Sequence, residues 1–224
     1  MATVNGMHKE PNYTAERRAM IRTQLQRRGI TDQRVLQAMR EVPRHTFVPP
    51  EWRHEAYSDR PLPIADDQTI SQPYMVAIMT QSLVLQGHEH VLEVGTGSGY
   101  QAAVLGRLAA QVHTIEYFPD LADRARAILQ HLGYANVQVI TGDGGLGLPA
   151  YAPYHDILVA AAAPHVPQSL LAQLAEGGRL VIPVGSVTNQ ELLIITRHGD
   201  AYAQERSVPC RFVPLLGQEG WADA

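Results

Sequence analysis

The segment VLEVGTGSGY, from Val91 to Tyr100, constrains the possible folds of this chain more than any other. Apolar residues lead directly into three glycines at alternate positions, a pattern that predicts a buried strand, a tight turn and the start of a helix. Glycine permits the positive φ angles of such a turn and lets a ligand approach the backbone without a Cβ clash. A second acid, Glu116, follows the next apolar run about 20 residues later, where a ribose would be held. Together these features predict a site for a nucleoside cofactor.

The spacing of the glycines bears on which cofactor is bound. Dinucleotide-binding enzymes typically carry G-x-G-x-x-G, which places a pyrophosphate at a helix N-terminus. Here the pattern from Glu93 to Gly99 is E-x-G-x-G-x-G, which resembles the first motif of S-adenosylmethionine-dependent methyltransferases. A dinucleotide site and a glycine-rich turn without a ligand are the two alternatives.

The composition is that of one globular enzyme domain. A chain of 224 residues can form one large α/β domain with an extension, but is short for two independent domains. Its apolar content of 45% argues against a disordered or fibrous chain. With 18 basic and 22 acidic residues the net charge is −4, which provides no broad basic face for a nucleic-acid backbone. We therefore expect no nucleic-acid partner.

Location and metal content also follow from the residue types. A single cysteine, Cys210, excludes an internal disulfide and is compatible with the cytosol. The polar N-terminus has no signal-peptide core, and no apolar run is long enough for a membrane span. The ten histidines do not have metal-ligand spacing, and the nearest approach, at 88–90, is interpreted as an exposed connection. We expect a cytoplasmic protein without membrane or metal partners.

Alternating strands and helices predict a doubly wound, mostly parallel α/β sheet. Helical spacing begins near Thr14 and stops at Gly29, and a second helix is expected to start with Thr31 as its cap. Pro73 suits the first turn of a third helix. Core strands are expected near residues 91–95, 112–115, 137–139, 157–161, 180–182 and 192–195 and around Phe212. We expect residues 1–13 to be a disordered lead and 14–224 a single domain, made of an N-terminal helical extension (14–88) and a core sheet (89–224).

Acidic residues at two predicted strand ends are candidate cofactor contacts, because ligands of open α/β sheets lie beyond the carboxyl ends of the strands. Glu116 can accept hydrogen bonds from both ribose hydroxyls. Asp143 can accept one from an adenine amino group, while adjacent backbone N–H groups serve the ring nitrogens. The alternative for each is an ordinary exposed acid at the end of a strand.

Six blocks of sequence together carry a closer resemblance. They are QTISQPY (68–74), VLEVGTGSGYQ (91–101), GDG (142–144), AAAP (161–164), EGGRLVIPVG (176–185) and RFVPL (211–215). Over nearly the whole chain, from about Thr14 to Leu216, the sequence resembles the protein-L-isoaspartate O-methyltransferase family. The glycine block alone indicates only a methyltransferase, whereas the TISQP block is specific, because in that family it belongs to the substrate side.

The resemblance implies a Rossmann-like methyltransferase that starts protein repair. Its members transfer a methyl group from S-adenosylmethionine to the free α-carboxylate of an L-isoaspartyl residue in a damaged protein, which leaves S-adenosylhomocysteine. A carboxylate, with a pKa of about 4, is already ionised at neutral pH and needs no general base. Catalysis would then come from in-line positioning and exclusion of water.

The resemblance also implies which residues form the site. Ser71 matches the family's active-site serine and would hold the carboxylate in line; the alternative is that Ser71 only caps the helix that begins near Pro73. The expected cofactor contacts are Glu93, Gly95, Thr96, Gly97, Ser98, Gly99, Glu116, Asp143 and Gly144. The expected substrate contacts are Thr69, Ile70, Gln72, Pro73, Val213 and Pro214. The damaged peptide is expected to lie extended across the cleft, although 213–215 can equally be an ordinary edge strand.

Departures from the family pattern leave substrate preference more open than cofactor identity. Ala65-Asp66-Asp67 stands where Gly-x-Gly is frequent, His155 where Asp is common, and Ala160 where a hydroxyl residue is frequent. One alternative is the same fold acting on another carboxylic acid or on a nucleic acid, although a base methylator would usually show an N-P-P-Y-like strand end. The other alternative is a cofactor-binding module without catalysis.

Overall fold

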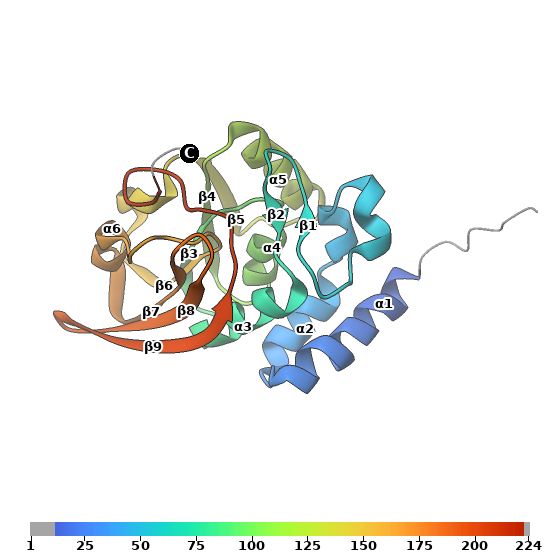
Figure 1. Cartoon of the computed structure of the whole chain (residues 1–224), viewed down its shortest axis with the longest axis horizontal. Helices are drawn as coiled ribbons and strands as arrows, with labels where there is room; N and C mark the ends of the chain where they lie inside the picture. The colour runs from blue at the N-terminus through green and yellow to red at the C-terminus, as the bar shows by residue number, and fades with distance from the viewer. Residues whose placement is uncertain (1–11, 222–224) are drawn as a thin grey trace, which may run out of the picture.

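The computed structural model describes residues 12–221, so most of the lead expected at 1–13 lies outside the described residues (Figure 1). Asn12 caps helix α1 (Tyr13–Met20) by accepting a hydrogen bond from the backbone N–H of Ala15 at 3.1 Å. The last two residues of the expected lead therefore belong to the first helix. This helix continues through a π-helical turn (Ile21–Leu25) and a 3₁₀ turn (Gln26–Arg28), and Gly29, with φ 88°, ends it as predicted.

The second helix, α2 (Gln33–Glu41), begins one residue later than expected. Its cap is Asp32 and not Thr31, because the Asp32 carboxylate accepts hydrogen bonds from the N–H groups of Arg34 and Val35. A carboxylate at this position also suits the positive end of the helix dipole. Two 3₁₀ turns (Arg44–Phe47 and Pro50–Glu55) and a short hairpin of β1 (Leu62–Pro63) and β2 (Thr69–Ile70) follow. Helix α3 (Pro73–Leu83) starts at Pro73 as predicted.

The core is a seven-stranded sheet in the order β5-β4-β3-β6-β7-β8-β9. Its first five strands are parallel, and β8 and β9 are antiparallel to their neighbours. The strands are β3 (His90–Val94), β4 (Gln111–Glu116), β5 (Val137–Thr141), β6 (Tyr154–Val159), β7 (Leu174–Gly185), β8 (Gln190–His198) and β9 (Ala201–Cys210). The connecting helices are α4 (Tyr100–Gly106), α5 (Pro119–His131) and α6 (Gln168–Ala172), with 3₁₀ turns at Gly144–Leu146 and Pro149–Tyr151. The predicted doubly wound, mostly parallel sheet is confirmed.

The last strand differs from its prediction. We expected it around Phe212, but β9 ends at Cys210. Because β9 is the edge strand and most of its side chains are exposed, its sequence has no apolar alternation to reveal it. Phe212 instead packs, partly buried, against the core after the strand has ended.

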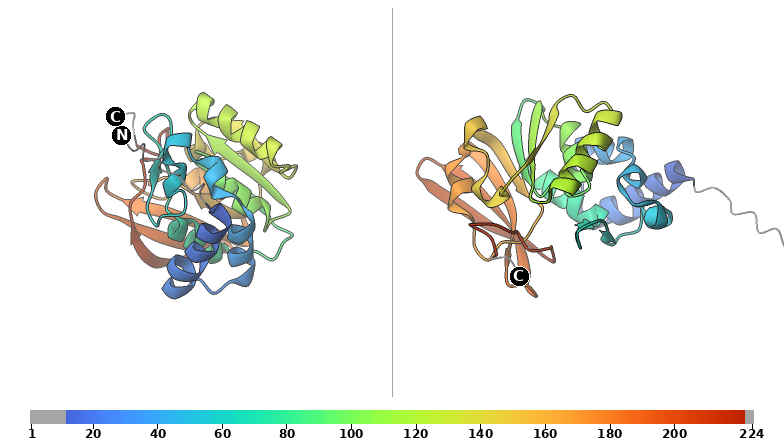
Figure 2. Two further views of the ribbon diagram at one scale, coloured as in Figure 1. Left: turned by 90° about the vertical axis from the view of Figure 1, so that its right-hand side faces the viewer. Right: turned by 90° about the horizontal axis from the view of Figure 1, so that it is seen from above.

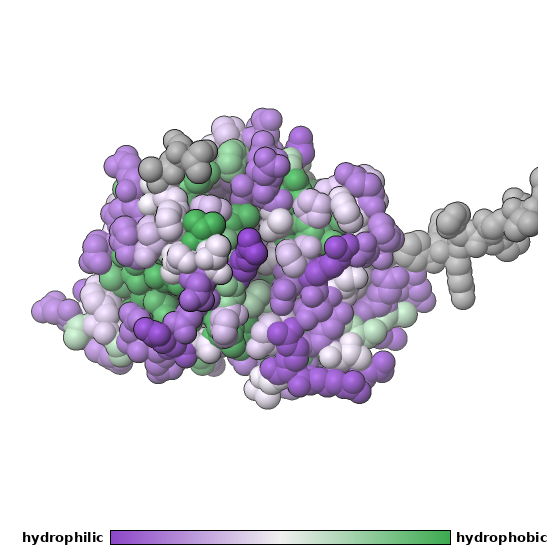
Figure 3. Space-filling view, in the orientation of Figure 1, coloured by the Kyte–Doolittle hydropathy of each residue, from purple (hydrophilic) through white to green (hydrophobic). Residues whose placement is uncertain are grey.

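Alternating strand residues build two cores on opposite faces of the sheet. Val91 and Leu158 face the side covered by α2 to α5, whereas Leu92 and Ile157 face the side covered by α6. The N-terminal helices and the C-terminal strands lie toward opposite ends of the molecule (Figure 2). On the face shown in Figure 3, the N-terminal helices are mostly hydrophilic. Among residues 12–221, no helix combines the length and the apolar character that crossing a bilayer requires.

One buried cation links two loops of the N-terminal extension and contacts the core at Tyr100. Arg44 is fully buried; its Nε donates to the carbonyl of Ala56 at 2.8 Å, and its Nη2 to the carbonyl of Ser71 at 2.7 Å. The guanidinium also lies 4.8 Å from the ring centroid of Tyr100 at the start of α4. Burial lowers the pKa of Arg44 to about 10, so the side chain remains charged at neutral pH.

We expect Arg44→Met to lower the free energy of unfolding by about 2–4 kcal/mol, because two buried carbonyls lose a charged donor. Urea denaturation measures this loss. The matched control is Arg40→Met on the exposed side of α2, where Arg40 bonds only Gln37, and it should cost less than about 0.5 kcal/mol. Equal losses in the two variants would contradict the linking role of Arg44.

Candidate active site at the carboxyl edge of the sheet

The site lies where the winding of the sheet reverses. From β3 the chain moves outward through β4 to β5, and it then returns to β6 on the other side of β3. Such a reversal opens a crevice at the carboxyl ends of the two central strands. The N–H of Ala160, just after β6, donates to the carbonyl of Val94 at 2.7 Å and holds this edge together.

The glycine turn joins β3 to α4 above this crevice. Gly95, Gly97 and Gly99 have φ angles of 91°, 51° and 86°, which glycine adopts with little strain. The N–H groups of Gly95 and Thr96 both donate to the carbonyl of Ile115, at 2.9 and 3.1 Å, which fixes the turn to the neighbouring strand.

The carboxylate of Glu116 supports the same turn from the end of β4. One oxygen accepts a hydrogen bond from the N–H of Gly97 at 2.7 Å and the other accepts one from the N–H of Phe118 at 3.1 Å. The residue is only 4% exposed, so it is not the exposed acid of the alternative interpretation. Burial raises the pKa of Glu116, and the backbone donors partly oppose this effect. Each oxygen retains a lone pair for a further donor.

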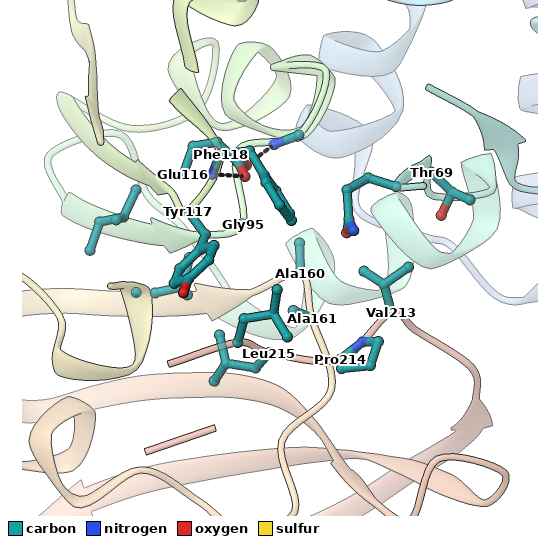
Figure 4. Close-up of a pocket in the computed structure, with 16 residues that line it drawn as sticks. Thr69, Gly95, Glu116, Tyr117, Phe118, Ala160, Ala161, Val213, Pro214 and Leu215 are labelled. Carbon is teal, nitrogen blue, oxygen red and sulfur yellow. Dashed lines mark hydrogen bonds between the residues drawn. The ribbon is translucent and has the colours of Figure 1, made fainter. Parts of the chain in front are cut away.

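A cavity opens beside Glu116 (Figure 4). Figure 4 shows the side chains that follow β4 on one side of this space and the 213–215 segment on the other. The lining residues are Gln68, Thr69, Val94, Gly95, Gly97, Ile115, Glu116, Tyr117, Phe118, Gly144, Ala160, Ala161, Val213, Pro214, Leu215 and Leu216. We refer to this space as the inner cavity.

Two further spaces adjoin the inner cavity around Ser71. A small cavity beside the glycine turn is lined by Ser71 and also by Thr69, Ile70, Val76, Gly95, Thr96, Gly97, Ser98, Tyr100, Gln101 and Ala160. A second small cavity, which we call the serine cavity, is lined by Ser71 together with Pro61, Thr69, Gln72, Met75, Ala160, Arg211, Phe212 and Val213. Ser71 therefore borders both the glycine turn and the C-terminal segment.

A larger outer groove continues from the serine cavity along the start of α3. It is lined by Arg28, Pro61, Thr69, Gln72, Tyr74, Met75, Val187, Val208, Pro209, Cys210, Arg211, Phe212, Val213 and Pro214. Its walls are mainly apolar, and they come from the TISQP block and from the end of β9 with the residues that follow it. Val213 and Pro214 line this groove, and Pro214 pairs with Ala162 in an isolated parallel bridge after β9 has ended. Their contact with a substrate stays a prediction.

Ser71 does not cap α3, so the capping interpretation of this residue is wrong. The cap position is occupied by Gln72, and within the described part of the chain no side-chain capping hydrogen bond is made there. Ser71 is half-buried, and its carbonyl accepts the hydrogen bond from Arg44. Within residues 12–221, its hydroxyl makes no hydrogen bond and is available to a ligand.

Several expected contact residues lie away from the inner cavity. Glu93 is fully buried beneath the turn, neither carboxylate oxygen meets a hydrogen-bond partner among the described residues, and burial raises its pKa to about 8. Gly99 allows helix packing, because a Cβ there would lie 3.3 Å from the Cβ of Ala125. Pro73 is buried in the first turn of α3. These three residues lie in the packing beneath the site and do not line the inner cavity.

Asp143 contacts a C-terminal strap, which we define as residues 215–221. One carboxylate oxygen accepts a hydrogen bond from the N–H of Gly145 at 2.9 Å, and the other accepts one from the N–H of Gln218 at 2.8 Å. The strap is also tied to the end of β6 by Trp221, whose indole N–H donates to the carbonyl of Ala162 at 3.1 Å. Asp143 therefore holds the strap, while the adjacent Gly144 lines the inner cavity.

The sequence did not indicate several lining residues. Tyr117 and Phe118 follow Glu116 directly, and their rings meet edge to face with centroids 5.5 Å apart. Two aromatic residues directly after an acid at a strand end could have predicted a nucleobase contact, because aromatic faces stack on bases. Leu215 and Leu216 gave no such signal, since they reach the inner cavity only through the path of the strap.

Comparison with known proteins identifies the family. The family model described as protein-L-isoaspartate(D-aspartate) O-methyltransferase (PCMT) matches residues 15–220. The chain belongs to this family. The family resemblance, the Rossmann-like fold and the methyltransferase class expected from the sequence are confirmed.

Individual relatives agree with this assignment. The chain is 56% identical over 210 residues to protein-L-isoaspartate O-methyltransferase 1 of Syntrophobacter fumaroxidans, a match that covers 94% of this chain and 98% of the relative. It is 55% identical over 206 residues to the enzyme of Methanoregula boonei, covering 92% and 95%. A protein-L-isoaspartate O-methyltransferase structure from Plasmodium falciparum, in complex with S-adenosyl-L-homocysteine, superposes with a TM-score of 0.78 at 26% identity, covering 92% and 99%.

Proposed function

We propose that this protein transfers a methyl group from S-adenosylmethionine to the free α-carboxylate of L-isoaspartyl residues in damaged proteins and peptides. One observation carries the proposal: the unbonded hydroxyl of Ser71 lies between the glycine turn and the wall formed by 211–213. A cofactor beside the turn and a peptide in the outer groove would meet there. Family membership and the S-adenosylhomocysteine in the Plasmodium falciparum relative support the same reaction.

The residues around the inner cavity fit an adenosyl cofactor. The free lone pairs of the Glu116 carboxylate would accept hydrogen bonds from the ribose hydroxyls, and the rings of Tyr117 and Phe118 provide apolar surface for the base. Gly95 and Gly97 let the cofactor lie against the backbone, and the backbone at Gly144 faces the same space. When bound, S-adenosylmethionine supplies an electrophilic methyl group on a sulfonium.

The acceptor requires positioning more than activation. An α-carboxylate is ionised at neutral pH, so no general base has to remove a proton. The Ser71 hydroxyl would donate a hydrogen bond to one carboxylate oxygen and leave the other free to attack the methyl group in line. Arg44 fixes the backbone of Ser71, and the apolar walls at Phe212 and Val213 exclude water.

Repair of the damaged residue becomes possible because the methyl ester has a better leaving group than the carboxylate. Methylation replaces a very poor leaving group with methoxide, so the neighbouring backbone nitrogen can close a succinimide. Hydrolysis of this ring returns part of the material to normal aspartate without the enzyme.

The end of β6 supports a carboxylate acceptor over a nucleic-acid base. Residues 160–163 are all alanine, so no side chain there can grip an exocyclic amino group. Among residues 12–221, no group of His, Cys, Asp and Glu side chains is arranged for a metal ion. A cytoplasmic location, and the absence of nucleic-acid, membrane and metal partners, stay predictions.

The activity is tested with radiolabelled S-adenosylmethionine and two matched peptides, one with L-isoaspartate and one with normal aspartate. We expect base-labile label on the isoaspartyl peptide alone, because a carboxyl methyl ester is cleaved by base. Bound cofactor without label on either peptide would overturn the proposed acceptor.

For Ser71→Ala we expect turnover of the isoaspartyl peptide to fall by about tenfold to a hundredfold, because a hydrogen bond to a charged group is lost. The melting temperature and the affinity for S-adenosylhomocysteine should stay unchanged, since Ser71 caps no helix. Ser82→Ala is the control, because its hydroxyl bonds the carbonyl of Ile78 within α3. Normal turnover in Ser71→Ala would refute the positioning role.

For Glu116→Gln we expect the affinity for S-adenosylhomocysteine to fall by about tenfold or more. The amide nitrogen cannot accept, so the variant loses both an acceptor for ribose and one support of the turn. Calorimetric titration measures the binding, and urea denaturation should show a loss below about 1.5 kcal/mol. Glu191→Gln, on β8, is the control, because Glu191 pairs with Arg206 and does not line the inner cavity. An unchanged affinity in Glu116→Gln would contradict the ribose role.

A further inference from the structure

The outer groove carries an uncompensated positive charge. Among the described residues that line it, the charged ones are Arg28 and Arg211. Arg28 is neutralised, because its Nη1 lies 2.6 Å from a carboxylate oxygen of Asp59 and its guanidinium stacks on Tyr74, 3.4 Å from the ring centroid. Arg211 is exposed, and within residues 12–221 its guanidinium has neither an ion pair nor a hydrogen bond.

The carboxylate of Glu191 does not neutralise the charge of Arg211. Glu191 lies on β8 opposite the end of β9, but its carboxylate pairs with Arg206 at 2.9 Å. The charge of Arg211 therefore faces the groove in a protein whose net charge is −4.

The backbone that presents Arg211 is held on both sides. The N–H of Phe212 donates to the side-chain carbonyl of Gln190 at 2.7 Å, and the Gln190 amide donates back to the carbonyl of Phe212 at 3.2 Å. The carbonyl of Val213 accepts a hydrogen bond from the N–H of Ala162 at 2.8 Å. Arg211 therefore projects from a fixed point, which lines both the serine cavity and the outer groove.

We propose that Arg211 selects isoaspartyl substrates that carry an acidic side chain close to the damaged residue. This inference rests on the proposed function, and it adds a preference within that substrate class. It names Arg211 as a specificity-determining residue, reached by a flanking carboxylate in the outer groove.

The reacting carboxylate is the less suitable partner for Arg211. A guanidinium typically binds a carboxylate through both oxygens, and two charge-assisted hydrogen bonds lower the nucleophilicity of both oxygens toward the methyl group. The neutral hydroxyl of Ser71 leaves one oxygen free. The chemistry therefore assigns the α-carboxylate to Ser71 and a second, flanking carboxylate to Arg211.

The test compares peptides that differ at one position near the isoaspartyl residue. Two sets, with the variable residue placed before or after the isoaspartyl residue, each contain Glu, Gln or Lys there. For the wild type we expect, in at least one set, a KM for the Glu peptide about threefold to fivefold below that for the Gln peptide, as for an exposed ion pair. The Lys peptide should have the highest KM, and the differences should vanish near about 1 M salt.

Substitutions then assign the preference to Arg211. Arg211→Gln should bring the ratio of KM values for the Glu and Gln peptides close to one, and Arg211→Lys should restore part of it. Arg40→Gln is the matched control, because this exposed arginine on α2 bonds Gln37 and does not line the groove. It should leave the ratio as in the wild type.

Each contrary result has a distinct meaning. A wild type that methylates all peptides equally would overturn the preference while leaving the proposed function intact. A uniform loss of kcat/KM for every peptide in Arg211→Gln, with the ratio preserved, would overturn the flanking contact. Methylation of none of the peptides by the wild type would be a failure of the proposed function itself.

Discussion

The reversal of winding between β3 and β6 is the constraint on which the rest of the site depends. Because β3 pairs in parallel with both β4 and β6, the chain segments that leave these strands must diverge. The turn there favours glycine because Gly95 has a φ of 91°, while a Cβ at this position would make an ordinary contact, 3.5 Å from the backbone of Ala160. The crevice, the glycine turn and the position of Glu116 all follow from this single junction.

The TISQP block, on the side where the acceptor carboxylate would bind, is held in place by a buried arginine. The TISQP block has little regular structure of its own, since β2 is two residues long and α3 begins only at Pro73. Its position is fixed from outside by Arg44, whose buried guanidinium bonds carbonyls from two separate loops. Burying a charge is costly unless it is paired, and among the described residues Nη1 of Arg44 has no hydrogen-bond partner, while Nη2 orients the backbone of Ser71. The N-terminal extension thus sets the geometry of the acceptor side.

The sequence predicted the features that depend on local patterns. The glycine turn, the start of α3 at Pro73 and the central strands carry strong periodicity or strict backbone requirements. The misses arise where tertiary contacts decide. Thr31 and Asp32 are both good caps, and only the direction of the incoming chain selects Asp32. No local pattern reveals that Asp143 also bonds the N–H of Gln218, 75 residues away, and its contact with adenine stays a prediction.

The protonation of Glu116 makes the properties of the site depend on pH. Its pKa is raised by burial, so it takes up a proton at a higher pH than an exposed glutamate does. Above this raised pKa the buried charge costs stability, and the cost is relieved as the pH falls through it toward the value of the unfolded chain. The same proton occupies an oxygen that would otherwise accept from a ribose hydroxyl. Acidification through this pKa therefore moves two properties in opposite directions: this group contributes more favourably to folding, while the hydrogen bond proposed from a ribose hydroxyl weakens.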